Sequence, residues 1–137
     1  MKTFFSIFIM FIVCSSSFAA EKTILSDKEI SELLIGKWQI SMIDNNVKID
    51  AVDEFLPDGS MKQKGVLTVS NNKINIEMKS TWKVENGILT STLLSITPKD
   101  MLPVGLTTSD TVISIDKEKF VYMDSETGER DTYHRVK

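Results

Sequence analysis

The sequence is poor in the residues that most enzymes and metal sites use. Its 137 residues contain one cysteine, Cys14, and one histidine, His134. Zinc sites take several thiolate or imidazole ligands, and the carboxylates here show no ligand spacing. A G-x-S-x-G nucleophile motif and a glycine-rich phosphate loop are also absent. We therefore expect no enzymatic activity, no metal and no other cofactor, and we expect His134 to be an exposed or edge residue.

A basic stripe is missing as well, because 16 lysines and arginines are interspersed with 19 acidic residues, giving a net charge of −3. This distribution argues against nucleic acid or an anionic membrane surface as the main partner. After the first twenty residues no apolar run is long enough to cross a bilayer, so we expect no membrane span. The length suits one domain with one core.

The amino-terminal segment is typical of a secretory signal peptide. Lys2 supplies the positive charge, residues 4–13 form an almost unbroken apolar run, and Ser17 and Ala19 are the small residues that signal peptidase favours. We therefore assign residues 1–19 as a signal peptide and residues 20–137 as the mature domain. That domain is expected to be periplasmic or secreted.

Two alternatives to a cleaved leader remain open. One is an uncleaved membrane anchor, and the other is lipidation of Cys14, as in bacterial lipoproteins. Val13 directly before the cysteine and Phe11 three positions before it differ from the small residue and the leucine of a lipobox. If Cys14 leaves with the signal peptide, the mature chain can form no disulfide and depends on its core for stability.

One helix is expected near the start of the mature domain, and strands are expected after it. Ser26 and Glu29 have the spacing of a capping box, apolar residues follow at helical spacing as far as Leu34, and Gly36 ends the run. From residue 37 onward the apolar period is two. The expected strands span roughly residues 37–44, 47–56, 60–70, 73–85, 88–96, 110–116, 119–124 and 129–136.

Four turns keep one apolar face in phase from strand to strand. They are Asn45-Asn46, Pro57-Asp58-Gly59, Asn71-Asn72 and Asn86-Gly87. The pairs that they predict are Met42 with Ile49, Phe55 with Met61, Val69 with Ile74, and Val84 with Leu89. A shift of one residue at any turn would move the apolar set to the other face. The constant phase predicts an all-β, eight-stranded antiparallel up-and-down barrel with one short helix, since closure leaves no exposed edges.

One stretch breaks the alternation. Residues 97–109 hold two of the three prolines and show no clean period, so we expect a long loop there. Its apolar residues are Met101, Leu102, Val104 and Leu106. They form a lid over the barrel mouth, contact a protein partner, or pack down as a cap on the core.

Several short motifs, taken in order, resemble those of the lipocalin-like (calycin) barrels, and of small bacterial domains in particular. Gly36-Lys37-Trp38 matches the G-x-W that opens the first strand in that superfamily. Residues 55–60 (FLPDGS) and 81–89 (TWKVENGIL) look like two motifs of the bacterial domains. The resemblance covers most of the mature chain and implies a shared barrel more than a shared ligand. The disulfides of many secreted lipocalins are lacking.

Three residues are expected to be structural. In the barrels that the chain resembles, a late arginine stacks over the opening tryptophan, and the resemblance gives these roles to Arg135 and Trp38. The two side chains can form a cation–π pair where the barrel closes. Trp82, in the second tryptophan motif, is the third.

The inward face carries polar residues that are candidates for ligand binding. Asp53 and Gln63 are expected to lie opposite one another, and Ser80 and Ser91 to share their face. Either these residues line a wet cavity that orients a ligand head group, or Asp53 is solvated at an open mouth or turned outward by a bulge. Together with Met101 and Leu102 from the loop, the four polar residues form the candidate ligand site.

Two functional hypotheses follow. The leading one is an exported, non-enzymatic barrel that binds a small apolar or amphipathic molecule in its interior. The alternative is a protein-binding module of the inhibitor or immunity type, which uses the 97–109 loop and has a solid core. The interior volume separates them, because a void below about 100 Å³ is smaller than usual ligand pockets and would exclude the carrier.

Overall fold

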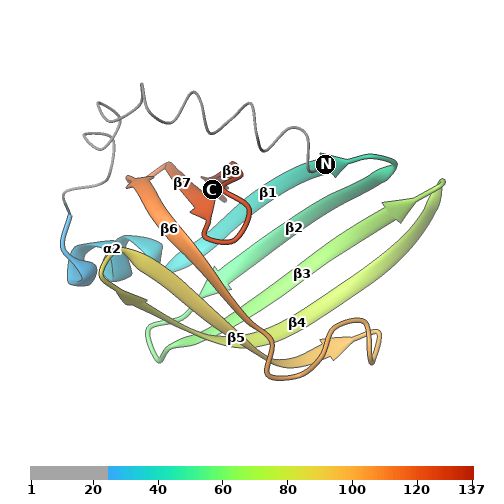
Figure 1. The fold of residues 1–137 in the computed structure, drawn as a ribbon, viewed down its shortest axis with the longest axis horizontal. Coiled ribbons are helices and arrows are strands. Elements are labelled where there is room, and N and C mark those ends of the chain that lie inside the picture. The colour runs from blue at the N-terminus through green and yellow to red at the C-terminus, as the bar shows by residue number, and fades with distance from the viewer. Residues whose placement is uncertain (1–24) are drawn as a thin grey trace.

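The protein is a closed antiparallel β-barrel with one helix before its first strand (Figure 1). The structure is a computed structural model, and it describes residues 25–137. The helix, α2, spans Asp27–Leu34. The strands are β1 Gly36–Asp44, β2 Val47–Phe55, β3 Ser60–Val69, β4 Asn72–Glu85, β5 Ile88–Thr97, β6 Thr107–Ile115, β7 Lys119–Asp124 and β8 Arg130–Arg135. Each strand pairs with the next, and β8 pairs with β1. The predicted eight-stranded up-and-down barrel is therefore confirmed.

The signal peptide predicted for residues 1–19, including Cys14, lies outside the described residues. Among the residues that are described, no helix is long and apolar enough to cross a membrane.

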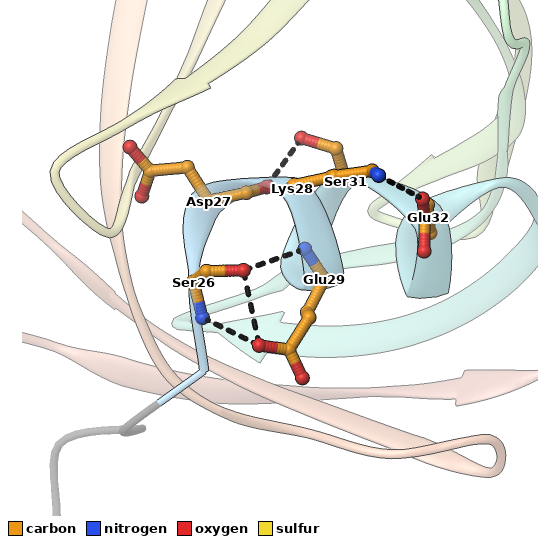
Figure 2. A network of polar contacts seen from close by, with 6 residues as sticks. All are labelled: Ser26, Asp27, Lys28, Glu29, Ser31 and Glu32. Atoms are coloured by element: carbon orange, nitrogen blue, oxygen red, sulfur yellow. Dashed lines mark hydrogen bonds and ion pairs between the residues drawn. The ribbon is translucent and has the colours of Figure 1, made fainter.

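Helix α2 begins with the predicted capping box (Figure 2). The backbone N–H of Glu29 donates to the Ser26 hydroxyl at 3.2 Å, and the Ser26 N–H donates to the Glu29 carboxylate at 3.3 Å. These bonds satisfy two of the backbone donors that a helix leaves free at its start. One face of the helix then buries Ile30 and Leu34 completely inside one end of the barrel.

A second contact holds this helix in place. The Asp27 carboxylate, which points away from the capping box in Figure 2, accepts the backbone N–H groups of Asn86 and Gly87 at 2.8 and 2.9 Å. Asn86 and Gly87 form the tight turn between β4 and β5 and both have positive φ. The helix is thus fixed to the barrel by its first turn as well as by its apolar face.

Three of the four predicted pairings at the turns are confirmed: Met42 with Ile49, Phe55 with Met61, and Val84 with Leu89. The fourth is wrong. The turn between β3 and β4 is Ser70-Asn71, so Ile74 pairs with Leu67 rather than with Val69. The overlapping pairs Ser70-Asn71 and Asn71-Asn72 give registers that differ by two residues. Both registers keep the same face inward, so the alternation pattern does not distinguish them.

The loop predicted for residues 97–109 is shorter than expected. Thr97 ends β5 and β6 begins at Thr107, which leaves residues 98–106 as the connection. Thr107 and Thr108 pair with Thr92 and Ser91 on β5. Threonine is β-branched and fits a strand, so these residues extend β6 toward the loop. The 98–106 loop is also tied to β5, since Leu93 exchanges backbone hydrogen bonds with Gly105 and Leu106 at 2.8 Å.

The core fills the end of the barrel that α2 covers. Trp38, Phe55 and Phe120 are at most 2% exposed and pack with Ile30 and Leu34. The Trp38 indole N–H donates to the Leu34 carbonyl at 2.8 Å, which joins the first strand to the end of the helix. Figure 1 shows the 98–106 loop on the side of the barrel away from α2.

Arg135 covers Trp38 where β8 meets β1. Its guanidinium carbon lies 4.2 Å from the centre of the indole ring, as a cation–π pair requires. The same guanidinium donates to the carbonyls of Leu33, Ile35 and Lys117 at 2.6 to 3.0 Å. Gly36 has a φ of +126°, and a Cβ there would lie 2.5 Å from the arginine nitrogen. The G-x-W sequence therefore provides both the ring and the space for the arginine above it.

Candidate functional site

A cavity of about 210 Å³ lies inside the barrel, between the core and the 98–106 loop. Its apolar wall comes from the core, from the sheet and from the loop, including Phe55, Met61, Met78, Leu89, Leu93, Leu102, Leu106 and Phe120. Its polar wall consists of Asp53, Gln63, Ser80, Ser91, Thr108, Asp110 and Tyr133. A mostly apolar pocket with a few convergent polar groups is the usual form of a small-molecule site.

The four polar residues singled out in the sequence all line this cavity. Asp53 pairs directly with Gln63 across β2 and β3, as expected from the turn between them. Ser80 pairs with Leu93 and Ser91 with Trp82, so both serines face the same interior. The side chain of Asp53 is 4% exposed, and it is therefore neither solvated at a mouth nor turned outward by a bulge.

The two loop residues of the predicted site differ from each other. Leu102 lines the cavity although its side chain is 40% exposed, so it covers one side of the interior. Leu106, near the start of β6, does the same. Met101 is not among the lining residues, and the structure does not bring it to the site. The next residue, Leu102, faces the cavity instead. The irregular pattern of the loop sequence does not indicate which of the two residues faces inward.

Asp53 is the most unusual group in the cavity. The Tyr133 hydroxyl donates to its Oδ2 atom at 2.8 Å, while Oδ1 is buried and has no hydrogen-bond partner among the described residues. Burial raises the pKa of Asp53 to about 6, against the lowering effect of the Tyr133 hydroxyl and of the Gln63 amide across the sheet. Gln63 thus lies near the carboxylate but does not complete a hydrogen bond to Oδ1.

A second carboxylate shares the polar wall. Asp110 on β6 pairs with Leu89 on β5 and faces the interior. Burial, and then the negative charges of Asp124 and Asp53, raise the pKa of Asp110 to about 6. The interior therefore carries mutually repelling carboxylates whose charge is costly to bury.

An aromatic stack fixes the position of the tyrosine hydroxyl. The rings of Phe120 and Tyr133 are parallel within 4° with their centres 5.1 Å apart, and Tyr122 lies 5.4 Å from Tyr133. Phe120 in turn meets the Trp38 ring edge to face at 5.8 Å. Burial raises the pKa of Tyr133 well above its usual range, with the charge of Asp53 as the next cause. Tyr133 therefore stays a hydroxyl donor at physiological pH.

Sequence reasoning missed three polar lining residues: Thr108, Asp110 and Tyr133. Tyr133 lies two positions before Arg135, so the period of two would have placed it on the inward face with that arginine. The expected bounds place Thr108 in the loop and Asp110 at the first position of the following strand. Pairing that strand with β5 from Thr107 onward would have placed Asp110 opposite Leu89.

Two further features of the described region carry less chemistry. An open depression of about 700 Å³ crosses β1 to β4 on the barrel and includes the exposed His134. Two charged residues that line it, Lys64 and Glu77, form an ion pair at 4.0 Å. Within residues 25–137, no group of three or more histidine, cysteine, aspartate or glutamate side chains is arranged to hold a metal ion.

Neither protein-family models nor curated proteins give a match to this chain.

Proposed function

We propose that this protein is an exported, non-enzymatic, lipocalin-like carrier that binds a small apolar or amphipathic molecule inside its barrel. The observation that carries the proposal is the interior cavity of about 210 Å³. It exceeds the limit of about 100 Å³ below which a carrier would have no room. The G-x-W motif beneath a terminal arginine, found here as Trp38 under Arg135, supports the lipocalin-like assignment.

The volume of the cavity limits the ligand to a small molecule. A water molecule occupies about 30 Å³ of liquid, so the cavity of about 210 Å³ corresponds to roughly seven waters. A ligand of about seven to ten non-hydrogen atoms is expected to fill it. Pockets for drug-sized ligands are larger, at about 300 to 1,000 Å³. The interior cavity is smaller than those pockets, so a long acyl chain would not be enclosed within it.

The arrangement of the walls favours an amphipathic ligand. Phe55, Leu89 and Phe120 form an apolar surface on the core side, and Leu102 closes the side toward the loop. Burying a ligand's apolar part against these side chains provides most of the binding free energy. Asp53 and its neighbours then orient the polar end.

A filled-cavity variant tests the proposal. Ser91 faces the cavity and its neighbour Thr90 on β5 faces the other side of the sheet, so Ser91→Phe and Thr90→Phe form a matched pair. We expect 2-phenylethanol, followed by NMR chemical-shift titration, to bind the wild type and Thr90→Phe with similar affinity. Ser91→Phe should weaken binding at least about tenfold, because the new ring occupies the ligand volume. Equal binding by both variants would place the ligand outside the barrel.

Native mass spectrometry of protein purified from its own host complements the titration. It reports bound small molecules and protein partners together. A co-purifying small molecule that Ser91→Phe loses would support the carrier.

The alternative function is a protein-binding module that uses the 97–109 loop. Met101 and Val104 in this loop are 38% and 69% exposed, which leaves apolar surface for a partner. The alternative also assumed a solid core, and the interior cavity argues against that assumption. A lysate pull-down with the wild type and with Val104→Ser tests this alternative. If the variant retains every partner that the wild type binds, the result counts against it.

A further inference from the structure

The polar wall of the cavity indicates the charge of the ligand, and this inference rests on the proposed function. Two carboxyl groups line the cavity, Asp53 and Asp110. None of the residues that line it in the described chain is a lysine, an arginine or a histidine. The cavity therefore holds negative charge without a positive partner from the protein.

The Oδ1 atom of Asp53 is the buried polar atom in this wall that has no hydrogen-bond partner within the described chain. It belongs to a residue that is 4% exposed. The Gln63 amide lies near the carboxylate, but no donor in the described chain completes a hydrogen bond to Oδ1. Buried polar atoms almost always have a hydrogen-bond partner, and a buried carboxylate without one is costly. The other oxygen is held by the Tyr133 hydroxyl, which fixes the orientation of the carboxylate. A molecule in the cavity can supply the donor that Oδ1 lacks.

We propose that the ligand is a small amine, whose ammonium group binds Oδ1 of Asp53 and whose apolar part lies against Phe55, Leu89 and Phe120. An ammonium group supplies both a donor and the positive charge that the wall lacks. Asp110 adds attraction from the facing strand β6. The serines Ser80 and Ser91 on the same interior face provide acceptors for the remaining N–H groups.

The surroundings disfavour the other small head groups. A carboxylate or phosphate would meet two acidic side chains and no basic one, so repulsion would exclude it. A neutral alcohol can donate one hydrogen bond to Oδ1 but leaves the charge of Asp53 uncompensated. The expected order of affinity is therefore amine, then alcohol, then carboxylate.

Three probes of similar size that differ in their head group test this order. They are 2-phenylethylamine, 2-phenylethanol and phenylacetate, titrated into the intact protein at neutral pH by calorimetry or NMR. We expect the amine to bind about tenfold or more tightly than the alcohol, because charge-assisted hydrogen bonds are roughly twice as strong as neutral ones. Phenylacetate should bind weakest.

Asp53→Asn is the decisive variant, and Asp50→Asn is its matched control. Asparagine keeps the shape of Asp53 and an oxygen that can accept from Tyr133, but removes the charge. Asp50 lies three positions earlier on β2, is exposed, and hydrogen-bonds with Ser41 outside the barrel. Asp53→Asn should remove most of the preference for the amine, with only the attraction of Asp110 left. The variant should retain its affinity for the alcohol, which also shows that it is folded. Asp50→Asn should leave both affinities unchanged.

The outcomes separate this inference from the proposed function. If the alcohol binds and the amine has no advantage, or if Asp53→Asn keeps the advantage, the amine inference is overturned and the carrier proposal stands. If phenylacetate binds best, the inference is overturned in the same way. If none of the three probes binds the wild type in the interior, the carrier proposal fails and the inference fails with it.

Discussion

Replacing Asp53 with asparagine should change how the stability of the protein depends on pH. The pKa of Asp53 is raised from 3.8 to about 6 in the folded state. A carboxyl group with a raised pKa binds its proton more tightly when folded than when unfolded. Its favourable contribution is therefore complete below pH 3.8 and is lost as the pH rises through 6.

The size of the effect follows from the shift. A change of about two pKa units corresponds to about 3 kcal/mol between the protonated and the ionised forms of this buried group. Lowering the pH from about 7.5 to about 4.5 recovers about 2 kcal/mol of that amount, because the unfolded carboxyl is still partly ionised at the lower pH. Asp110 changes in the same direction, since the charge of Asp53 is one cause of its raised pKa.

Urea denaturation across this pH range measures the effect. The wild-type free energy of unfolding should gain about 2 kcal/mol more on acidification than that of Asp53→Asn. Tyr133, Gln63 and Trp38 face Asp53 from β8, β3 and β1, and asparagine retains an oxygen that can accept from Tyr133. Comparison of the two profiles cancels the exposed carboxylates that both proteins share.

Asp50→Asn is again the control. The pKa of this exposed aspartate is lowered, mainly by the Ser41 hydroxyl, so its contribution has the opposite sign. Its removal should not reduce the gain in stability on acidification. Parallel profiles for the wild type and Asp53→Asn would refute the reasoning, because they would show that the folded pKa of Asp53 is close to its unfolded value.

Two predictions concern the contacts that close the barrel. Arg135→Met should lower the free energy of unfolding by roughly 2–4 kcal/mol in urea denaturation, because it removes the contact with Trp38 and the bonds to three carbonyls; full recovery in Arg135→Lys would contradict this geometry. Asp27→Ala should cost about 1–2 kcal/mol and speed hydrogen exchange at the Asn86 and Gly87 amides. Unchanged exchange there would show that these bonds do not hold the helix.

Local signals in the sequence were sufficient to predict the barrel. The turn at Asn86-Gly87 and the alternation around it fix a register without any long-range information, and the capping box fixes the helix start in the same way. The alternation also placed Asp53 and Gln63 inside and opposite each other. At Asn71, two overlapping turns are possible and both keep the same apolar face inward. The sequence therefore does not decide between the two strand registers.

Other parts of the site depend on contacts that no local pattern contains. Tyr133 contacts Asp53, and Asp110 shares its cavity, only because the barrel closes and brings strands from distant parts of the sequence around one interior. The volume of the cavity likewise depends on how large side chains pack, and the same residues could have filled the interior. Leu102 rather than Met101 turns inward because of the path of the 98–106 loop. These features depend on the three-dimensional packing of the chain.

The position of Asp53 is difficult to explain as a contribution to stability. Its burial costs about 3 kcal/mol at neutral pH when no cation is present, and asparagine would fit the same space and keep an acceptor for Tyr133. The core proper, around Trp38 and Phe120, is closed by α2 and contains no such charge. Natural proteins often lose stability at functional sites, where a group is held ready for a ligand rather than for its neighbours. An amine in the cavity would supply the missing charge and the missing donor together, so the residue that weakens the empty barrel is the one expected to strengthen the occupied one.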